Sequence, residues 1–401
     1  MGDAAFANHQ RASAAFSTLR AGWGSGIVNW LAGCVQILIM LAASAFGIGF
    51  GMAAWRDTGN AFAGAMLLWA MLYYPAMIVH ELGHYFGARL AGMAVLHVRL
   101  SAIEIRPQQR GFRMRWNPIR KQLRVGGYVM AFSDPARPRR EQVIALASGG
   151  PAVNLALAVV LVVAGWAWLP HRAGWLCEAF AAMNAGMGFA NLVPRQGIVP
   201  SDGRTLLQAL RHRLNDSPQV RLISLSVFGC TADRLPGEDL VALEAQASPL
   251  PLVALWYRLK AHQNRGEWKE AVSMRATLDE RLHAMDQTPA SRPADLIAVI
   301  QTEIAFSQAM VTKDAAVLVD GLLPPKVAWD VPFLWPRCLA LRAALAGDMA
   351  RCVESLVVSR RYAENAIDQA LPISERMIRA SMAASFGDAW SEEAIGSVRT
   401  A

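Results

Sequence analysis

Residues 21–55 read AGWGSGIVNWLAGCVQILIMLAASAFGIGFGMAAW, a run of 35 residues between Arg20 and Arg56 that contains no Asp, Glu, Lys or Arg. A second such run, of 29 residues, lies between Glu141 and His171. The hydrocarbon core of a bilayer is about 30 Å thick, and a helix of roughly 20 apolar residues crosses it. Both runs are long enough to cross, so the sequence predicts an integral membrane protein.

The composition of the whole chain agrees with this prediction. Of its 401 residues, 54% are hydrophobic and 17% are charged, whereas an ordinary soluble domain has about 25% charged residues. So much apolar surface excludes a disordered or collagen-like chain. The five cysteines are scattered and form no C-x-x-C pair, so neither a disulfide framework nor a cysteine-ligated metal site is expected.

Four membrane spans are expected, near residues 30–54, 61–90, 142–169 and 173–194. The loop between the second and third spans is strongly basic, because residues 99–140 contain eleven basic residues against Glu104 and Asp134. Basic loops beside spans stay in the cytoplasm, which places this loop and both termini on that side of a bacterial inner membrane. The formal net charge of +8 therefore needs no nucleic acid as a partner.

The basic loop also carries an alternating pattern of apolar and charged residues. The alternation runs through residues 98–106 and 112–116, and Leu123, Val125 and the glycine-rich segment 126–129 follow. A period of two over short runs is typical of strands and favours a small antiparallel sheet in a β-rich loop, residues 95–140. A plain cytoplasmic connector is the alternative.

The composition changes after about Arg204. The longest charge-free run there covers 13 residues, 245–257, which is too short for a span. Helix–turn–helix patterns occur near residues 255–271, 309–316 and 343–350. The last two are offset by 34 residues, the period of tetratricopeptide (TPR) repeats, although the first lies 47 residues before the second. This region is either a TPR-like stack that binds a protein partner or an ordinary helical bundle.

His80-Glu81-Leu82-Gly83-His84 is an H-E-x-x-H segment inside the second predicted span. Residues four apart share one face of a helix, so both imidazoles can reach a single metal ion. Zinc accepts imidazole ligands, and a catalytic zinc site leaves a position open for water, from which Glu81 could take a proton. Ionisable residues within a membrane helix are costly and by default indicate function. This favours a zinc site over a chance cluster near a helix end.

Two histidines do not complete such a site. The outstanding acidic candidate for a third ligand is Asp202, in Pro200-Ser201-Asp202-Gly203-Arg204, just after the fourth predicted span. Asp-Gly is also a common turn signal. The residues alone therefore leave both interpretations of Asp202 open.

In three segments the sequence resembles the site-2 proteases, a family of intramembrane zinc metalloproteases. The segments are His80 to His84, Gly150-Pro151-Ala152-Val153-Asn154, and Asn191-Leu192-Val193-Pro194 followed by Asp202-Gly203. Gly126-Gly127-Tyr128-Val129 also resembles a glycine-rich strand of that family, and the resemblance covers about residues 61–210. Two features depart from the family pattern. The step of eleven residues from Asn191 to Asp202 is longer than usual, and Ser201 stands where leucine is common.

The resemblance implies a metalloprotease that cuts a membrane-anchored regulatory protein. It implies that His80, His84 and Asp202 bind Zn²⁺ and that Glu81 is the catalytic base. The basic loop would correspond to the family's membrane-associated sheet, whose edge could pair with a substrate strand.

The resemblance further implies that Asn154 and Asn191 hold an unwound substrate segment. A side-chain amide in a membrane interior must find a partner, and an extended backbone offers unpaired N–H and C=O groups. Hydrogen bonding between helices is the alternative for each asparagine.

The expected fold class is mainly α: a polytopic membrane bundle of about four spans with a small sheet, followed by a C-terminal TPR-like helical domain. The expected domains are a cytoplasmic N-terminal segment, 1–29, a membrane-embedded metalloprotease domain, 30–210, and a cytoplasmic helical domain, 211–401. The competing hypothesis is a non-catalytic membrane scaffold that acts through its helical repeats. Glu81 argues against that hypothesis, because a structural zinc site has no use for a base. A transporter is less favoured, because the spans show no inverted repeat.

Overall fold

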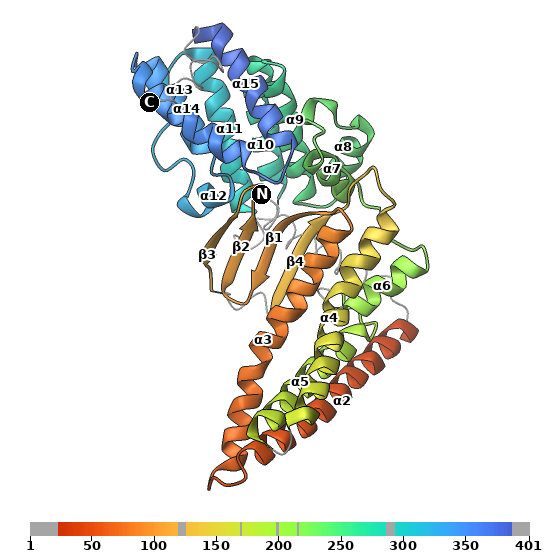
Figure 1. The fold of residues 1–401 in the computed structure, drawn as a ribbon. Coiled ribbons are helices and arrows are strands. Elements are labelled where there is room, and N and C mark those ends of the chain that lie inside the picture. The colour runs from red at the N-terminus through yellow and green to blue at the C-terminus, as the bar shows by residue number, and fades with distance from the viewer. Residues whose placement is uncertain are drawn as a thin grey trace. The chain divides into compact units, whose positions relative to one another are not determined.

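The computed structural model describes residues 23–118, 126–168, 171–197, 200–214, 216–285 and 293–386. The chain divides into two compact units, one containing Ala14–Pro107 and Gly111–Asn215 and the other containing Asp216–Ala401. Helices dominate both units (Figure 1). The prediction of a mainly helical protein with a small antiparallel sheet is confirmed.

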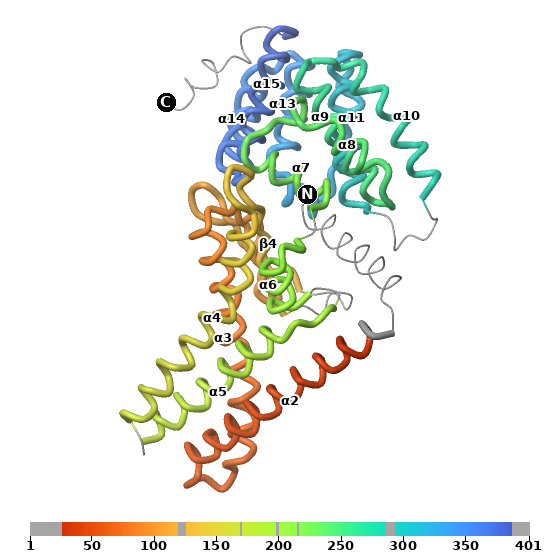
Figure 2. The backbone as a smooth tube through the Cα atoms, turned by 90° about the vertical axis from the view of Figure 1, so that its right-hand side faces the viewer, coloured from red at the N-terminus to blue at the C-terminus, as the bar shows by residue number. Residues whose placement is uncertain are grey.

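The first unit is a bundle of long helices. Its helices are α2 (Trp23–Ala54), α3 (Ala61–Leu90), α4 (Arg139–Trp168), α5 (Arg172–Leu192) and the short α6 (Asp202–Leu210). α5 packs against α2, α3 and α4, and Figure 2 shows α2 and α5 side by side. The outer surface is apolar, since Leu38, Leu67 and Val163 are each at least 64% exposed. Such a surface suits contact with lipid.

Three of the four predicted spans, in α2, α3 and α4, are helices long and apolar enough to cross a membrane. The predicted fourth span is the helix α5, which is not among them and which carries Glu178, Asn184 and Asn191. Glu178 and Asn184 are buried in the bundle. The helix α2 begins at Trp23, so the expected N-terminal segment 1–29 overlaps it, and residues 1–22 lie outside the described part of the chain.

The basic loop folds into a four-stranded antiparallel sheet rather than a plain connector. Its strands are β1 (Ala94–Leu100), β2 (Ile103–Pro107), β3 (Phe112–Trp116) and β4 (Gly127–Phe132), in the order β3-β2-β1-β4. The apolar side chains of one face, including Val95 and Val98, pack against Ala88 of α3. The opposite face is polar, and buried Glu104 accepts a hydrogen bond from Arg115 Nε at 2.7 Å. Leu123 and Val125, which continue the sequence pattern, lie outside the described residues.

Glycines allow α3 and α4 to approach closely where the two helices cross. A Cβ atom on Gly83 would collide with the carbonyl oxygen of Gly149, and a Cβ atom on Gly149 would collide with that of Gly83. Small residues are typical of helix crossings in membranes, because they permit close backbone packing. The H-E-x-x-H turn of α3 therefore lies directly against α4.

The second unit is entirely helical in its described residues. Its helices are α7 (Pro218–Val227), α8 (Gly237–Glu244), α9 (Leu250–Asn264), α10 (Trp268–Ala284), α11 (Ala294–Thr312), α12 (Pro325–Asp330), α13 (Leu334–Leu345), α14 (Met349–Glu364) and α15 (Ala370–Phe386), with 3₁₀ helices η1 (Ala232–Arg234) and η2 (Ala315–Val317). Two of the predicted helix–turn–helix units are present, α9–α10 and α13–α14, with turns at Gly266 and Gly347. Near residues 309–316, however, α11 ends and η2 follows. The two tight hairpins therefore do not form a 34-residue repeat, and the TPR-like prediction is not confirmed.

By length and composition, α11 also qualifies as a membrane span, in a region for which the sequence predicted none. Its surroundings are those of a core helix, because 61% of its most apolar stretch is buried within the structure. Its Glu303, 1% exposed, forms ion pairs with Lys260 Nζ at 3.2 Å and with Arg337. Burying one charge alone would cost several kcal/mol, so these charges are buried together.

Candidate metal centre

The two histidines of the H-E-x-x-H segment lie one helical turn apart on α3 and are 5% and 8% exposed. Asp202, far away in the sequence, is the first residue of α6. The Nε2 atom of His80 lies 3.0 Å from Asp202 Oδ2, and that of His84 lies 3.3 Å from Asp202 Oδ1. The two Nε2 atoms are 3.1 Å apart. The structure therefore brings together the three side chains expected as ligands.

These separations fit a zinc ion between the three side chains. Ligand atoms at 2.0–2.2 Å from a tetrahedral zinc lie about 3.3–3.6 Å from one another. The observed separations, 3.0 to 3.3 Å, reach this range or fall a few tenths of an ångström below it. Among the residues that the structure describes, His80, His84 and Asp202 are also the group of His, Cys, Asp and Glu whose ligand atoms lie close enough to hold a metal.

The other nitrogen of each ring fixes which nitrogen faces the centre. His84 Nδ1 lies 2.7 Å from the carbonyl oxygen of Leu146, which can only accept, so Nδ1 carries the proton. His80 Nδ1 donates to Asn154 Oδ1 at 2.7 Å. When both rings are neutral, each Nε2 atom therefore directs a lone pair toward the other and toward the Asp202 carboxylate. Such acceptors repel one another unless a proton or a metal cation lies between them, and in histidine metal sites the second nitrogen is likewise hydrogen-bonded.

The residues around these histidines also match a known family model. Residues 68–174 match the model of peptidase family M50. Peptidase family M50 is the site-2 protease family. The M50 segment includes both histidines and Asn154, and it ends before Asp202. The resemblance to site-2 proteases is thereby confirmed, and it supports a membrane metalloprotease of a zinc-dependent family. Comparisons with curated proteins and with solved structures gave no match.

Glu81, between the two histidines of the M50 segment, is 6% exposed. Its Oε2 atom has no hydrogen-bond partner among the described residues. A Cβ atom on Gly127, at the start of β4, would lie 2.7 Å from Glu81 Oε1. Burial of a carboxylate without partners is unfavourable. A carboxylate beside a metal centre and free to bind a proton is what a base in metal-assisted hydrolysis requires.

Asn154 lies behind His80. It is fully buried, and its Nδ2 atom donates to the carbonyl of Ala76 at 3.2 Å and to Asn184 Oδ1 at 2.8 Å. These acceptors fix the orientation of the amide, so its oxygen faces His80. These hydrogen bonds join α4 to α3 and α5. Hydrogen bonding between helices was the alternative that the sequence left open for Asn154. Sequence reasoning does not single out Asn184, although it is likewise an amide within a predicted span.

Asn191 is not in contact with His80, His84 or Asp202 in the described residues. Its Nδ2 atom donates to the carbonyl oxygen of Met187 in its own helix, at 3.1 Å. With Gln36 and Ser44 of α2, it lines a cavity of about 360 Å³ between α2 and α5. The sequence predicted the same role for Asn154 and Asn191, whereas of these two the structure places only Asn154 in contact with His80.

Proposed function

We propose that this protein is a zinc-dependent intramembrane endopeptidase that hydrolyses peptide bonds in or near the transmembrane segment of a membrane-anchored, regulatory protein. The observation that carries the proposal is the convergence of His80, His84 and Asp202 beside a buried Glu81 that lacks a described partner. A structural metal site needs no such carboxylate. The arrangement therefore favours a peptidase over a scaffold.

The residues of the chain have distinct tasks in this reaction. A zinc ion held by the three ligands would polarise the scissile carbonyl and lower the pKa of a bound water. Glu81 would accept the proton of the attacking water and deliver it to the leaving amine nitrogen. The Leu146 carbonyl and Asn154 would keep the imidazole rings oriented. The surrounding helices would keep the site in a low-dielectric setting, where these interactions are stronger.

The strand β4 is the proposed substrate-binding edge. It lies at one end of the strand order formed by the described residues, and its first residue, Gly127, adjoins Glu81. An extended peptide added to this edge would pass beside the base. A helical substrate must first unwind, because the carbonyls of an intact helix are hydrogen-bonded. Asn191, on the cavity between α2 and α5, would contact the unwound segment farther from the metal.

The orientation and the partners also belong to this proposal. The basic residues of the loop favour the cytoplasmic side of a bacterial inner membrane for the sheet and both termini. The helical second unit would offer a surface to a protein partner.

Two measurements on the full chain, purified in detergent without chelators, test the proposal. Wild-type protein should contain about one zinc per chain, Glu81→Gln should retain it, and Asp202→Ala should lose most of it. After reconstitution, the wild type should cleave a single-span test protein with Gly-Pro in its span faster than a matched test protein with an all-leucine span.

Glu81→Gln should reduce this cleavage at least about a hundredfold, because the proton acceptor is removed. Absence of zinc from the wild type, or cleavage by Glu81→Gln at the wild-type rate, would overturn the proposed function. A scaffold would be indifferent to this substitution.

A further inference from the structure

The loop between α5 and α6, which ends at Asp202, is attached to α2. The side-chain amide of Asn29 pairs with both backbone groups of Gln196. Asn29 Nδ2 donates to the Gln196 carbonyl oxygen at 2.8 Å, and the Gln196 N–H donates to Asn29 Oδ1 at 2.6 Å. One side chain thus satisfies both the N–H and the C=O group of this loop residue, as a neighbouring β-strand would.

Two further α2 residues on the same helix face continue this attachment, since positions four and seven residues after Asn29 lie one and two turns along. Gln36 Nε2 donates to the carbonyl of Ala190 at 2.9 Å, and Arg195 Nη1 donates to Gln36 Oε1 at 3.2 Å. A Cβ atom on Gly33 would lie 3.5 Å from Arg195 Cζ, which is ordinary contact distance, so Gly33 lies against the guanidinium. Asn29, Gly33 and Gln36 are called the α2 latch below.

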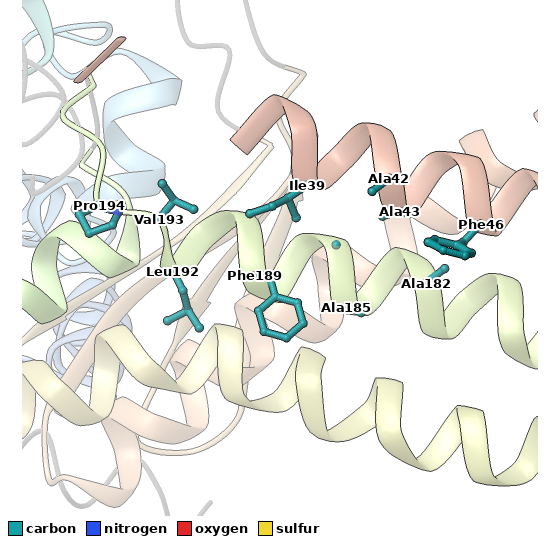
Figure 3. Close-up of a pocket in the computed structure, with 11 residues that line it drawn as sticks. Ile39, Ala42, Ala43, Phe46, Ala182, Ala185, Phe189, Leu192, Val193 and Pro194 are labelled. Atoms are coloured by element: carbon teal, nitrogen blue, oxygen red, sulfur yellow. The ribbon is translucent and has the colours of Figure 1, made fainter. Parts of the chain in front are cut away.

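Figure 3 shows how the loop begins at this place. Val193 and Pro194 leave the end of α5, and together with Ile39 of α2 they line an apolar cavity of about 680 Å³ between α2 and α5. The cavity lies next to the latch along α2. The polar contacts of the latch therefore hold the loop beside this cavity, where α2 and α5 are less closely packed.

The residue before Asp202 closes the loop on itself. Ser201 Oγ donates to the Val193 carbonyl at 2.7 Å and accepts a hydrogen bond from the Arg195 N–H at 2.9 Å. The Ser201 N–H donates to the Arg195 carbonyl at 3.1 Å. Leucine at position 201 would lack this hydroxyl. The described residues on the two sides of the step from Asn191 to Asp202 are thus bonded to each other, and α2 holds the side that includes Arg195 and Gln196.

We propose that the α2 latch positions Asp202 as the third metal ligand, with Asn29 as the principal positioning residue. Both α2 and Asp202 lie outside the segment matched by the family model. The residue proposed as third ligand is thus held in place by a helix that the family model also does not cover. Loss of the Asn29 contacts would free the loop, and the carboxylate would spend less time at the two histidines. The inference rests on the proposed function only in requiring that Asp202 binds a metal.

A double-mutant cycle on the full chain in detergent tests this inference. The zinc affinity of wild type, Asn29→Ala, Asp202→Ala and the double variant is measured by competition with a chromophoric chelator. Asn29→Ala should weaken zinc binding about 10- to 100-fold, as expected for a residue that orients a ligand. In the Asp202→Ala background it should have an effect of less than about twofold, because the two substitutions act through one interaction.

A spectroscopic readout and a matched control accompany the cycle. With Co²⁺ in place of zinc, the absorption bands of Asn29→Ala should shift toward those of Asp202→Ala, because both lose carboxylate coordination. Ser44→Ala is the control on the same helix, since the Ser44 hydroxyl donates to the Met40 carbonyl of its own helix. It should bind zinc as the wild type does.

Equal weakening in both backgrounds, or an unchanged affinity of Asn29→Ala, would overturn the inference. If Asn29→Ala does not fold, Gln36→Ala is carried through the same cycle with the same two criteria. Wild-type protein without zinc would overturn both the proposed function and this inference. If the wild type binds zinc and cleaves, and Asn29→Ala behaves in the same way, this inference alone is overturned.

Discussion

Asn154 determines which nitrogen of His80 faces the metal centre, because its amide oxygen accepts the Nδ1 proton. Replacement by alanine would leave that N–H, the Ala76 carbonyl and Asn184 without this partner. We therefore expect Asn154→Ala to weaken zinc binding about 10- to 100-fold. Metal titration of the purified variant measures the change.

Asn191→Ala is the matched control for this prediction, because it removes an asparagine amide from the neighbouring helix α5 without touching a contact of His80, His84 or Asp202. It should retain zinc, and a role in substrate binding would raise KM while leaving the metal content unchanged. Equal loss of zinc in both variants would contradict the assignment of Asn154 to His80.

At the scale of the helices, the crossing of α3 and α4 depends on backbone contact at Gly83 and Gly149. A methyl group at Gly83 would push the helices apart beside the two histidines. We expect Gly83→Ala to lower the stability of the membrane unit by about 1–3 kcal/mol, as overpacking typically does, and to reduce zinc content. Thermal unfolding in detergent and metal analysis check both effects.

Gly64→Ala is the control for this prediction on the same helix. A Cβ atom there would lie 3.6 Å from Trp55, which is ordinary contact, and alanine is a better helix former than glycine. This variant should be as stable as the wild type or slightly more stable. Equal destabilisation by both substitutions would point to helix propensity or detergent effects instead of the crossing.

On the scale of the whole molecule, the second unit has its own core, with four charges buried at its centre. Arg337, fully buried, pairs with Glu303 and with Glu375 Oε1, the latter at 2.5 Å, and Lys260 joins both carboxylates. Arg337→Met would leave two carboxylates with one cation and should destabilise this unit by roughly 3–5 kcal/mol. Faster hydrogen exchange in α11, α13 and α15 of the full chain would report this.

Arg342→Met provides the comparison on the same helix, α13. Arg342 pairs with Asp320, whose side chain is 80% exposed, and an exposed pair contributes less than about 1 kcal/mol. Hydrogen exchange should change little in this variant. The zinc content of Arg337→Met should also stay unchanged, because no described ligand contact involves this unit. A loss of zinc would show coupling between the two units.

Local properties of the sequence were sufficient for much of this molecule. Charge-free length predicted the helices α2 and α4, an apolar stretch predicted α3, and a period of two predicted the sheet, because hydropathy and periodicity belong to segments that are contiguous in the chain. The spacing of His80 and His84 placed both on one face of α3, since a helix repeats every 3.6 residues. The α11 helix shows the limit of this information. Its apolarity alone allows a span, and only its neighbours show that it is a core helix.

Only the tertiary structure decided what comes together from distant parts of the chain. Whether Asp202 reaches the histidines, and which of Asn154, Asn184 and Asn191 contacts a ligand, depends on the packing of helices. The amides are chemically identical, so no local pattern separates them. The hydrogen bond between Gln196 and Asn29 likewise joins residues 167 positions apart, so no local pattern could predict it. By itself, the sequence determined the long membrane helices, the sheet and the shared helix face of the two histidines. Helix packing determined that Asp202 and its supports reach these histidines, because such convergence is set by contacts between segments far apart in the chain.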